Sequence, residues 1–353
     1  MYSHFLSNFT TSSIFRRFFA IAIRFEIAFQ NPNVVLCYIH YLVTFLSIQN
    51  LKVRYQTQGK QVHAVDDVSF SLEDNESIGI AGESACGKST LGLTLMRALQ
   101  ANATVSGEIL LDDKSILNIP DEEFTKTLRW KKISMVFQGA MNSLDPVFTI
   151  KQQFEEILKK HGFEGDRQKA ILEAINSVDL PTSVLEKFPH ELSGGMKQRI
   201  VISMALLLKP RLVIADEPTT ALDVLVQAQI MTLLKKLKKE GISVMLISHD
   251  LGIISEIAEK IGIMYAGKIV EFGYLSDIYK NPKHPYTEAL LKSVPKLKGE
   301  SNLVSLQGNP PSLINPPDGC RFYDRCPHAM EKCKKEPPKI TTPGGYVLCW
   351  LYE

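Results

Sequence analysis

The sequence predicts an α/β protein in which a mostly parallel sheet is flanked by helices. Short β-branched and apolar runs alternate with segments of helical periodicity, and this alternation is typical of parallel strands joined by helices. A glycine-rich loop also links one such run directly to a helical segment. Since the 353 residues show no internal repeat, we expect one α/β unit with appendages.

Strands are expected where β-branched and apolar residues cluster. Between about 140 and 192 the chain keeps helical periodicity with no convincing strand, which predicts an inserted helical subdomain. After about 280, proline and glycine become frequent, as at 309–319, and predict an irregular appendage rather than a further core. The expected strands are 45–55, 65–72, 76–81, 132–137, 212–215, 243–248 and 261–271.

Composition is that of an ordinary globular chain, with 45% hydrophobic and 22% charged residues. This balance excludes a disordered or collagen-like chain. The formal net charge of +2 argues against a polybasic arm that binds nucleic acid, so no nucleic-acid partner is expected.

The N-terminal extension, residues 1–43, has two interpretations. Residues 14–29 place phenylalanines on one helical face and arginines opposite, as in a helix lying on a membrane surface. Alternatively, the start is misassigned and translation begins near Val43, because no methionine stands between Met1 and Met96. The longest mostly apolar run is shorter than the about 20 residues that span a bilayer, so no transmembrane helix is expected.

The strongest local signal is a phosphate-binding loop, or P-loop, between the strand expected at 76–81 and a helical stripe that begins at Leu91. Its glycines let backbone N–H groups wrap a phosphate, and the following helix N-terminus adds partial positive charge. Lys88 is expected to bridge the β- and γ-phosphates of ATP and Ser89 to ligate Mg²⁺. The expected nucleotide-binding residues are Gly82, Glu83, Ser84, Ala85, Cys86, Gly87, Lys88, Ser89 and Thr90.

Two carboxylates follow the strand expected at 212–215. Mg²⁺ with bound phosphate requires a carboxylate at the mouth of a neighbouring strand, and Asp216 suits that role. Glu217 would then face the γ-phosphate and polarise the attacking water. The pair therefore predicts an ATPase.

The segment LSGGM at 192–196 resembles the signature of the ATP-binding cassette (ABC) family, whose last residue is usually glutamine rather than methionine. Ser193, with the N–H groups of Gly194 and Gly195, opens a helix and forms a second anion site. The resemblance implies that this site binds ATP held by a second ABC ATPase subunit.

Further residues match the family's motifs in order. The resemblance implies that Tyr55 stacks on adenine, Asp223 communicates across the dimer and His249 contacts the γ-phosphate. It implies that Gln138 approaches Mg²⁺ and the attacking water and couples them to the transmembrane partner. With Lys88 and Glu217, Gln138 and His249 complete the expected catalytic set. Ala85 departs from the glycine of many relatives, and we expect it to adopt a right-handed conformation that preserves function.

The resemblance implies a RecA-like P-loop core with an antiparallel β part, over an ABC ATPase domain at 44–279 that contains the helical subdomain at about 140–192. The C-terminal extension, 280–353, is similar to that of dipeptide, oligopeptide and nickel importer ATPases. The similarity lies in NPKHPYT at 281–287 and GCRFYDRCP at 319–327.

This similarity implies an ATPase subunit that powers import of di- or oligopeptides from the cytoplasmic side of the cell membrane. Its implied partners are a second ATPase subunit, two transmembrane permeases and an extracytoplasmic peptide-binding protein. The alternatives are a nickel importer and a soluble ABC ATPase of translation or DNA repair. The importer-like tail argues against the soluble ATPase. His284 and Tyr286 are expected to pack a proline-rich turn rather than to catalyse.

Four cysteines crowd into the end of the chain with the spacing C-x5-C-x6-C-x15-C. Four thiolates can hold a [4Fe–4S] cluster or one tetrahedral Zn²⁺, although the short C-x2-C pairs typical of zinc are absent. The resemblance implies that some importer ATPases of this class carry an iron–sulfur cluster here. A cluster, a zinc ion and no metal remain the alternatives, and a structural clip is sufficient explanation. The cysteines are Cys320, Cys326, Cys333 and Cys349.

Overall fold

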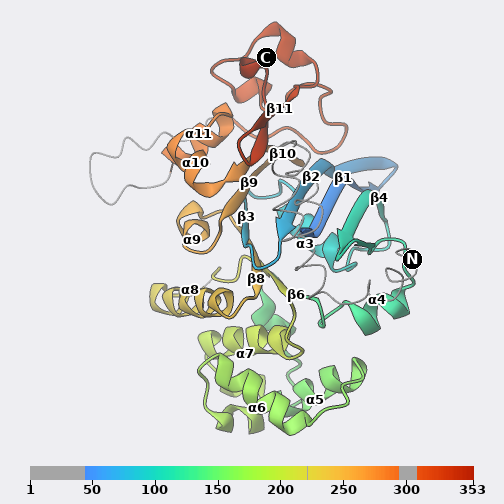
Figure 1. Ribbon diagram of the computed structural model, residues 1–353, viewed down its shortest axis with the longest axis vertical. Helices are drawn as coiled ribbons and strands as arrows, with labels where there is room; N and C mark the ends of the chain where they lie inside the picture. Colours follow the sequence, from blue (N-terminus) through green and yellow to red (C-terminus); the bar gives the residue numbers. More distant parts are fainter. Residues whose placement is uncertain (1–43, 221, 294–307) are drawn as a thin grey trace, which may run out of the picture.

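The computed structural model describes residues 44–220, 222–293 and 308–353, which form two sheets surrounded by helices (Figure 1). The two interpretations of residues 1–43 lie outside these ranges. Within them, no helix is long and apolar enough to cross a membrane. The larger sheet runs β11 (Lys339–Thr342), β12 (Gly345–Leu348), β10 (Lys268–Tyr274), β9 (Lys260–Tyr265), β3 (Ile78–Ala81), β8 (Ser243–Ser248), β7 (Leu212–Asp216) and β6 (Ile133–Val136).

The centre of the larger sheet is parallel, as predicted. Strands β9, β3, β8, β7 and β6 pair in parallel, and every residue of these strands is buried. Continuous apolar runs suit this position because helices or a second sheet cover both faces. The carboxyl ends of β3 and β7 therefore deliver the P-loop and the two carboxylates to the same edge.

The run expected as one strand at 261–271 is instead a hairpin, and that prediction was wrong. Strands β9 and β10 pair antiparallel around Ala266 and Gly267, whose φ angles are 45° and 89°. Positive φ at both central residues matches the twist of a tight hairpin. Alanine is not a typical residue for such a turn, so the sequence signal was weak.

The smaller sheet is antiparallel, and its apolar face packs on the helix that follows the P-loop. Leu91 and Leu95 of α3 (Lys88–Leu95) are fully buried in a cluster that contains residues of both sheets. Strand β4 was not expected, because Gly107 interrupts its apolar pattern. The smaller sheet runs β2 (Lys60–Glu73), β1 (Thr44–Thr57), β4 (Ala103–Leu111) and β5 (Lys114–Ser115).

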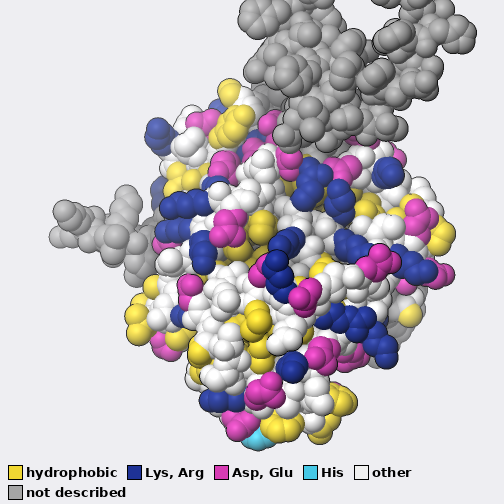
Figure 2. Space-filling model, turned by 60° about the horizontal axis from the view of Figure 1, so that its bottom comes forward, with side chains coloured by type: hydrophobic (Ala, Val, Ile, Leu, Met, Phe, Trp, Pro, Cys, Tyr) yellow, Lys and Arg dark blue, Asp and Glu magenta, His cyan; other side chains and the backbone are white. Residues whose placement is uncertain are grey.

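Helices cover the opposite face of the larger sheet and form a separate lobe. Between β6 and β7 the described chain has no strand, and α5, α6 and α7 lie together at the lower end of Figure 1. Basic and acidic side chains are interspersed on the face in Figure 2. The remaining helices of the cassette are α4 (Asp121–Thr127), η1 (Ala140–Ser143), α5 (Ile150–Lys160), α6 (Arg167–Ser177), η2 (Thr182–Glu186), η3 (Pro189–Glu191), α7 (Gly194–Leu206), α8 (Val224–Lys239) and α9 (Leu251–Ser255).

The described residues of the C-terminal extension, 280–293 and 308–353, include helices and a β-hairpin that the expectation of an irregular appendage did not contain. Its strand β12 pairs antiparallel with β10, so the extension adds a hairpin to the edge of the larger sheet. Phe322 is 1% exposed and contacts the rings of Tyr265 and Tyr286, which joins the extension to the core. The helices after β10 are α10 (Leu275–Lys280), α11 (Pro285–Lys292), η4 (Tyr323–Arg325), η5 (Glu331–Lys334) and η6 (Trp350–Tyr352).

Candidate functional site

The P-loop passes close to neighbouring backbone at two glycines. Gly82 and Gly87 have φ angles of 154° and 106°. A Cβ on Gly82 would stand 2.0 Å from the carbonyl oxygen of Met264, and one on Gly87 would stand 2.0 Å from that of Ala64. No side chain fits at either position, so these glycines allow the loop to lie between β2 and β9.

Ala85 adopts a left-handed conformation with φ of 61°, so the expectation of a right-handed conformation was wrong. A left-handed residue with a Cβ is strained by about 1 kcal/mol. Glycine avoids this strain, which gives a physical reason for glycine in many relatives. The tight path of the loop through this position overrides the preference of alanine.

Lys88 lies along the inside of the loop. Its ammonium group donates hydrogen bonds to the carbonyl oxygens of Gly82 and Glu83, both at 2.8 Å, and the residue is 5% exposed. Cys86 Sγ lies 3.8 Å from the Lys88 ammonium, and burial raises the pKa of this thiol. Lys88 is thus a buried cation whose hydrogen bonds go to uncharged carbonyl oxygens.

Ser89 and Asp216, the two residues expected to bind Mg²⁺ from different elements, contact each other. Burial raises the pKa of the Asp216 carboxyl, whereas the hydrogen bond from the Ser89 hydroxyl and the charge of Lys88 lower it. Asp216 is 2% exposed, and its Oδ1 has no hydrogen-bond partner among the described residues. An unpaired carboxylate oxygen beside a hydroxyl is a donor set that fits the hard cation Mg²⁺.

Two of the predicted catalytic side chains, Gln138 and His249, lie against the carboxylate of a third, Glu217. Glu217 Oε2 accepts hydrogen bonds from Gln138 Nε2 at 3.1 Å and from Thr220 Oγ1 at 3.0 Å, and Glu217 Oε1 lies 3.3 Å from His249 Nδ1. Gln138, Glu217 and His249 follow three parallel strands, β6, β7 and β8, which end at one edge of the sheet. Thr220 was not among the predicted residues, although it stands in the TTALD segment that contains Asp223.

Tyr55 lies apart from that carboxylate, near the end of β1. It pairs with Val62 of β2 and Ala103 of β4, and its ring is partly buried against the core. The antiparallel sheet therefore presents Tyr55 beside the core, on a different element from the P-loop.

The signature residues and Asp223 begin two neighbouring helices. Ser193 caps α7 by accepting a hydrogen bond from the Met196 N–H at 3.3 Å, and Asp223 caps α8 through the Val226 N–H at 3.0 Å. Gly194 opens α7 and is exposed, and Gly195 follows it. Within the described chain, no hydrogen bond or ion pair joins these residues to the P-loop.

Two residues of the C-terminal extension contact the P-loop, although neither was among the predicted residues of this site. Tyr286 Oη accepts a hydrogen bond from the Glu83 N–H at 3.0 Å, and the Arg325 guanidinium pairs with the Glu83 carboxylate. These partners are 203 and 242 residues from Glu83 in sequence. No local motif could have indicated such contacts.

The four clustered cysteines are free thiols that influence one another. Burial, together with the smaller effects of the other three cysteines, raises the pKa of Cys320 to about 11. Cys326 and Cys333 each likewise raise the pKa of Cys349. Among the described residues, no group of three or more His, Cys, Asp or Glu side chains is arranged to hold a metal ion.

Comparison with known proteins adds two family matches. Residues 65–220 match the model described as ABC transporter, and residues 270–333 match the model described as oligopeptide/dipeptide transporter, C-terminal region. The first match contains the P-loop, Gln138, the signature and both strand-end carboxylates. The second contains Tyr286, Arg325 and three of the four clustered cysteines.

Curated relatives resemble the chain over most of its length. The oligopeptide transport ATP-binding protein OppD of Haemophilus influenzae is 44% identical over 87% of this chain and 97% of its own length. The dipeptide transport ATP-binding protein DppD of Bacillus subtilis is 42% identical over 87% of this chain and 95% of its own.

A solved structure shares the fold of the cassette. The dimeric post-hydrolysis state of the ATP-binding cassette MJ0796, bound to ADP and Pi, superposes with a TM-score of 0.58 and 29% sequence identity. The match covers 65% of this chain and 98% of that one.

Proposed function

The chain belongs to the ABC transporter family, among the oligopeptide and dipeptide transport ATP-binding proteins, and we propose that it powers import of di- and oligopeptides. Its ABC cassette is an ATPase. The observation that carries the peptide assignment is the transporter-type C-terminal region that follows the cassette in the same chain. Nothing in the described structure favours nickel over peptide.

Phosphate binding is assigned to the P-loop, with Lys88 as its cation. The Lys88 ammonium leaves the carbonyl oxygens of Gly82 and Glu83 and binds the β- and γ-phosphates, while N–H groups of residues 82–90 cradle the β-phosphate. Partly buried Tyr55 supplies the ring for adenine. The unpaired Oδ1 of Asp216 and the Ser89 hydroxyl, aided by Gln138, would hold Mg²⁺, which neutralises phosphate charge when bound.

Hydrolysis is assigned to Glu217 as the group that polarises the attacking water. The carboxylate accepts hydrogen bonds from Gln138 and Thr220, which fix its orientation toward the end of the sheet where the P-loop lies. His249 is close enough to Glu217 to be held by it, and is 61% exposed at its side chain, so it can reach the γ-phosphate. Positioning and charge, rather than covalent chemistry, account for the reaction.

A second ATPase subunit would complete each site. Ser193, Gly194 and Gly195 present backbone N–H groups at the start of α7, where an anion is stabilised, but no polar contact joins them to the P-loop of their own chain within the described residues. Beside Asp223, Val224 and Leu225 are 82% and 70% exposed. This apolar pair supports contact with a partner cassette.

Two transmembrane permeases and an extracytoplasmic peptide-binding protein would complete the importer, with this chain peripheral on the cytoplasmic side of the cell membrane. Val147 and Phe148 are 70% and 45% exposed in the connection between β6 and α5 that also contains Gln138. Exposed apolar groups in this connection would let a permease loop act on Gln138, and through it on Glu217.

A metal at the four cysteines also stays a proposal. Their mutual electrostatic effects support one shared site, although the described side chains are not arranged for a metal ion. We assign no reaction step to a metal here. Iron, sulfide and zinc analysis of anaerobically purified protein, with absorbance near about 400 nm, distinguishes an iron–sulfur cluster from zinc and from no metal.

The importer assignment is tested by gentle affinity purification of the chain from membranes of its native host. Mass spectrometry of the co-purifying proteins is expected to recover two polytopic permeases and a second cassette subunit. Recovery of ribosomal or DNA-associated proteins, with nothing polytopic, would leave the ATPase standing and overturn the transport assignment.

A further inference from the structure

Glu83 of the P-loop is held at each of its polar groups by a different partner. Its N–H donates to Tyr286 Oη at 3.0 Å, its carbonyl oxygen accepts from Lys88 Nζ at 2.8 Å, and its carboxylate accepts two hydrogen bonds from Arg325, both at 3.0 Å. Tyr286 and Arg325 belong to the C-terminal extension. The extension therefore fixes both the backbone and the charge of a residue inside the phosphate loop.

The Arg325 guanidinium is itself fixed by its surroundings. Its side chain is 6% exposed, and it donates a hydrogen bond to Tyr265 Oη at 3.1 Å. The guanidinium carbon lies 5.7 Å and 5.9 Å from the ring centroids of Tyr265 and Phe322. A two-pronged arginine–carboxylate pair whose arginine is buried is strong and directional, and lysine cannot reproduce its geometry.

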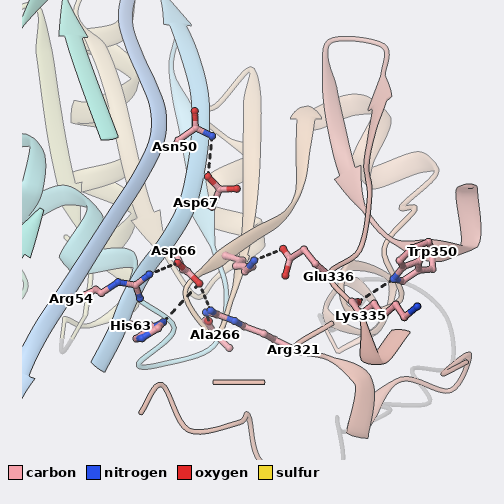
Figure 3. A network of polar contacts seen from close by, with 11 residues as sticks. Asn50, Arg54, His63, Asp66, Asp67, Ala266, Arg321, Lys335, Glu336 and Trp350 are labelled. Atoms are coloured by element: carbon pink, nitrogen blue, oxygen red, sulfur yellow. Dashed lines mark hydrogen bonds and ion pairs between the residues drawn. The ribbon is translucent and has the colours of Figure 1, made fainter. Parts of the chain in front are cut away.

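A second arginine of the same segment supports the other side of the loop. Arg321 donates hydrogen bonds to the carbonyl oxygen of Ala266 and to Asp66 of β2 (Figure 3). The next residue of that turn, Gly267, donates its N–H to the carbonyl oxygen of Cys86 at 2.8 Å. Arg321 thus supports the turn that supports the P-loop.

The charge of Glu83 is the chemical reason for such an arrangement. A carboxylate within a loop that binds phosphate repels the nucleotide unless a cation compensates it. We propose that Arg325 is a positioning residue that acts through Glu83, so that nucleotide affinity depends on the C-terminal extension. The inference rests on the phosphate-binding role proposed above for the P-loop.

The test is equilibrium titration of the full chain with MgADP, which binds the loop without turnover. Arg325→Ala leaves the Glu83 charge without its arginine. We expect this variant to raise the dissociation constant for MgADP about tenfold, which corresponds to the free energy of one charge-assisted contact. Arg325→Lys keeps the positive charge without the paired geometry and should raise the dissociation constant about threefold. The defect of Arg325→Ala should shrink as ionic strength rises from about 0.05 M to 0.5 M, because salt screens the repulsion.

A second substitution separates electrostatic positioning from a merely structural role. In the double variant Glu83→Gln/Arg325→Ala the repelling charge is gone, so the dissociation constant should return to within about threefold of the wild type. Lys334→Gln, which removes an exposed cation of the same extension, should leave it unchanged. A double variant as weak as Arg325→Ala, or an Arg325→Ala variant that binds like the Lys334 control, overturns the proposal.

Two further variants keep these outcomes interpretable. If Arg325→Ala fails to fold, Glu83→Gln alone decides, because it removes the repelling charge. MgADP binding at least as tight as in the wild type supports the proposal, and weaker binding overturns it. Lys88→Ala tests the loop itself. If Lys88→Ala binds MgADP normally, the phosphate-loop assignment fails, whatever the Arg325 variants show.

Discussion

The catalytic edge of the larger sheet and the C-terminal extension both contact the P-loop, but the sequence encodes them differently. Asp216 ends β7, Glu217 follows it and Lys88 begins α3, and each stands within a short motif whose chemistry can be read locally. Arg325 and Tyr286 reach the same loop only after the chain has folded, from positions more than 200 residues away. The comparison teaches that motifs locate the reacting groups, whereas distant contacts set the loop that holds them.

The largest effect should follow Glu217→Gln, which tests the catalytic edge alone. Loss of the carboxylate that we propose to polarise water is expected to lower the steady-state ATP hydrolysis rate about a thousandfold, while ATP binding is retained because the amide keeps the size of the side chain. Phosphate release and nucleotide binding are measured on the same preparation. Undiminished hydrolysis would contradict the assignment.

Lys88→Ala should act on binding rather than on chemistry. Removal of the buried cation is expected to weaken MgATP binding about a hundredfold, because several charge-assisted hydrogen bonds to phosphate are lost. Titration with a fluorescent nucleotide measures the dissociation constant. An unchanged constant would show that the loop binds nucleotide without its lysine.

Arg321→Ala probes how firmly the extension is attached to the cassette. The substitution leaves Asp66 with Arg54 as a remaining partner and the Ala266 carbonyl without this donor, so we expect a loss of about 2 kcal/mol and a lower thermal midpoint. Arg321 is 3% exposed at its side chain, so solvent cannot replace it readily. Lys126→Ala, in an exposed pair, serves as the control and should not shift the midpoint. If the two variants have equal thermal midpoints, the attachment of the extension through Arg321 does not contribute to the stability of the core.

The smallest effect concerns pH and His284. Burial lowers the pKa of His284 to about 3 from its usual 6.5. Below pH 6.5 the unfolded chain binds a proton at this residue while the folded chain does not, so its contribution to stability is lost as pH falls toward about 3, by at most about 1.4 kcal/mol per pH unit. Thermal midpoints between about pH 7 and 5 should fall with acid.

His284→Asn isolates that effect. The His284 Nδ1 accepts the Tyr286 N–H at 3.1 Å as the cap of α11, and asparagine can accept the same bond without titrating. The variant should therefore show a shallower fall of the midpoint with acid. An unchanged slope would mean that other groups dominate the acid response.

Much of the fold could be predicted because its signals are local. The buried parallel strands are continuous apolar runs, and the helical lobe keeps its periodicity across 140–192. The hairpin at 261–271 was missed because Ala266 is a poor turn signal, although tertiary contacts hold it at positive φ. The conformation of Ala85 was also predicted wrongly. The closed path of the loop, not the preference of alanine, determines its backbone conformation.

The candidate site likewise contains residues that motifs predict and contacts that motifs do not predict. Gln138, Glu217 and His249 could be chosen from motifs, and the structure brings them together around one carboxylate. The contacts of Glu83 with Tyr286 and Arg325 could not be predicted from the sequence. Neither partner stands in a nucleotide-binding motif, and only the packing of the extension against β9 brings them to the loop.

The most direct test of peptide import is ATP hydrolysis by the purified complex in lipid vesicles, measured with and without peptide-loaded binding protein. We predict that the loaded binding protein stimulates hydrolysis and that Glu217→Gln abolishes the stimulated rate, because transport and turnover share one carboxylate. If the loaded binding protein does not change the ATP hydrolysis rate of a complex that contains both permeases, the assignment of this ATPase to peptide import is contradicted.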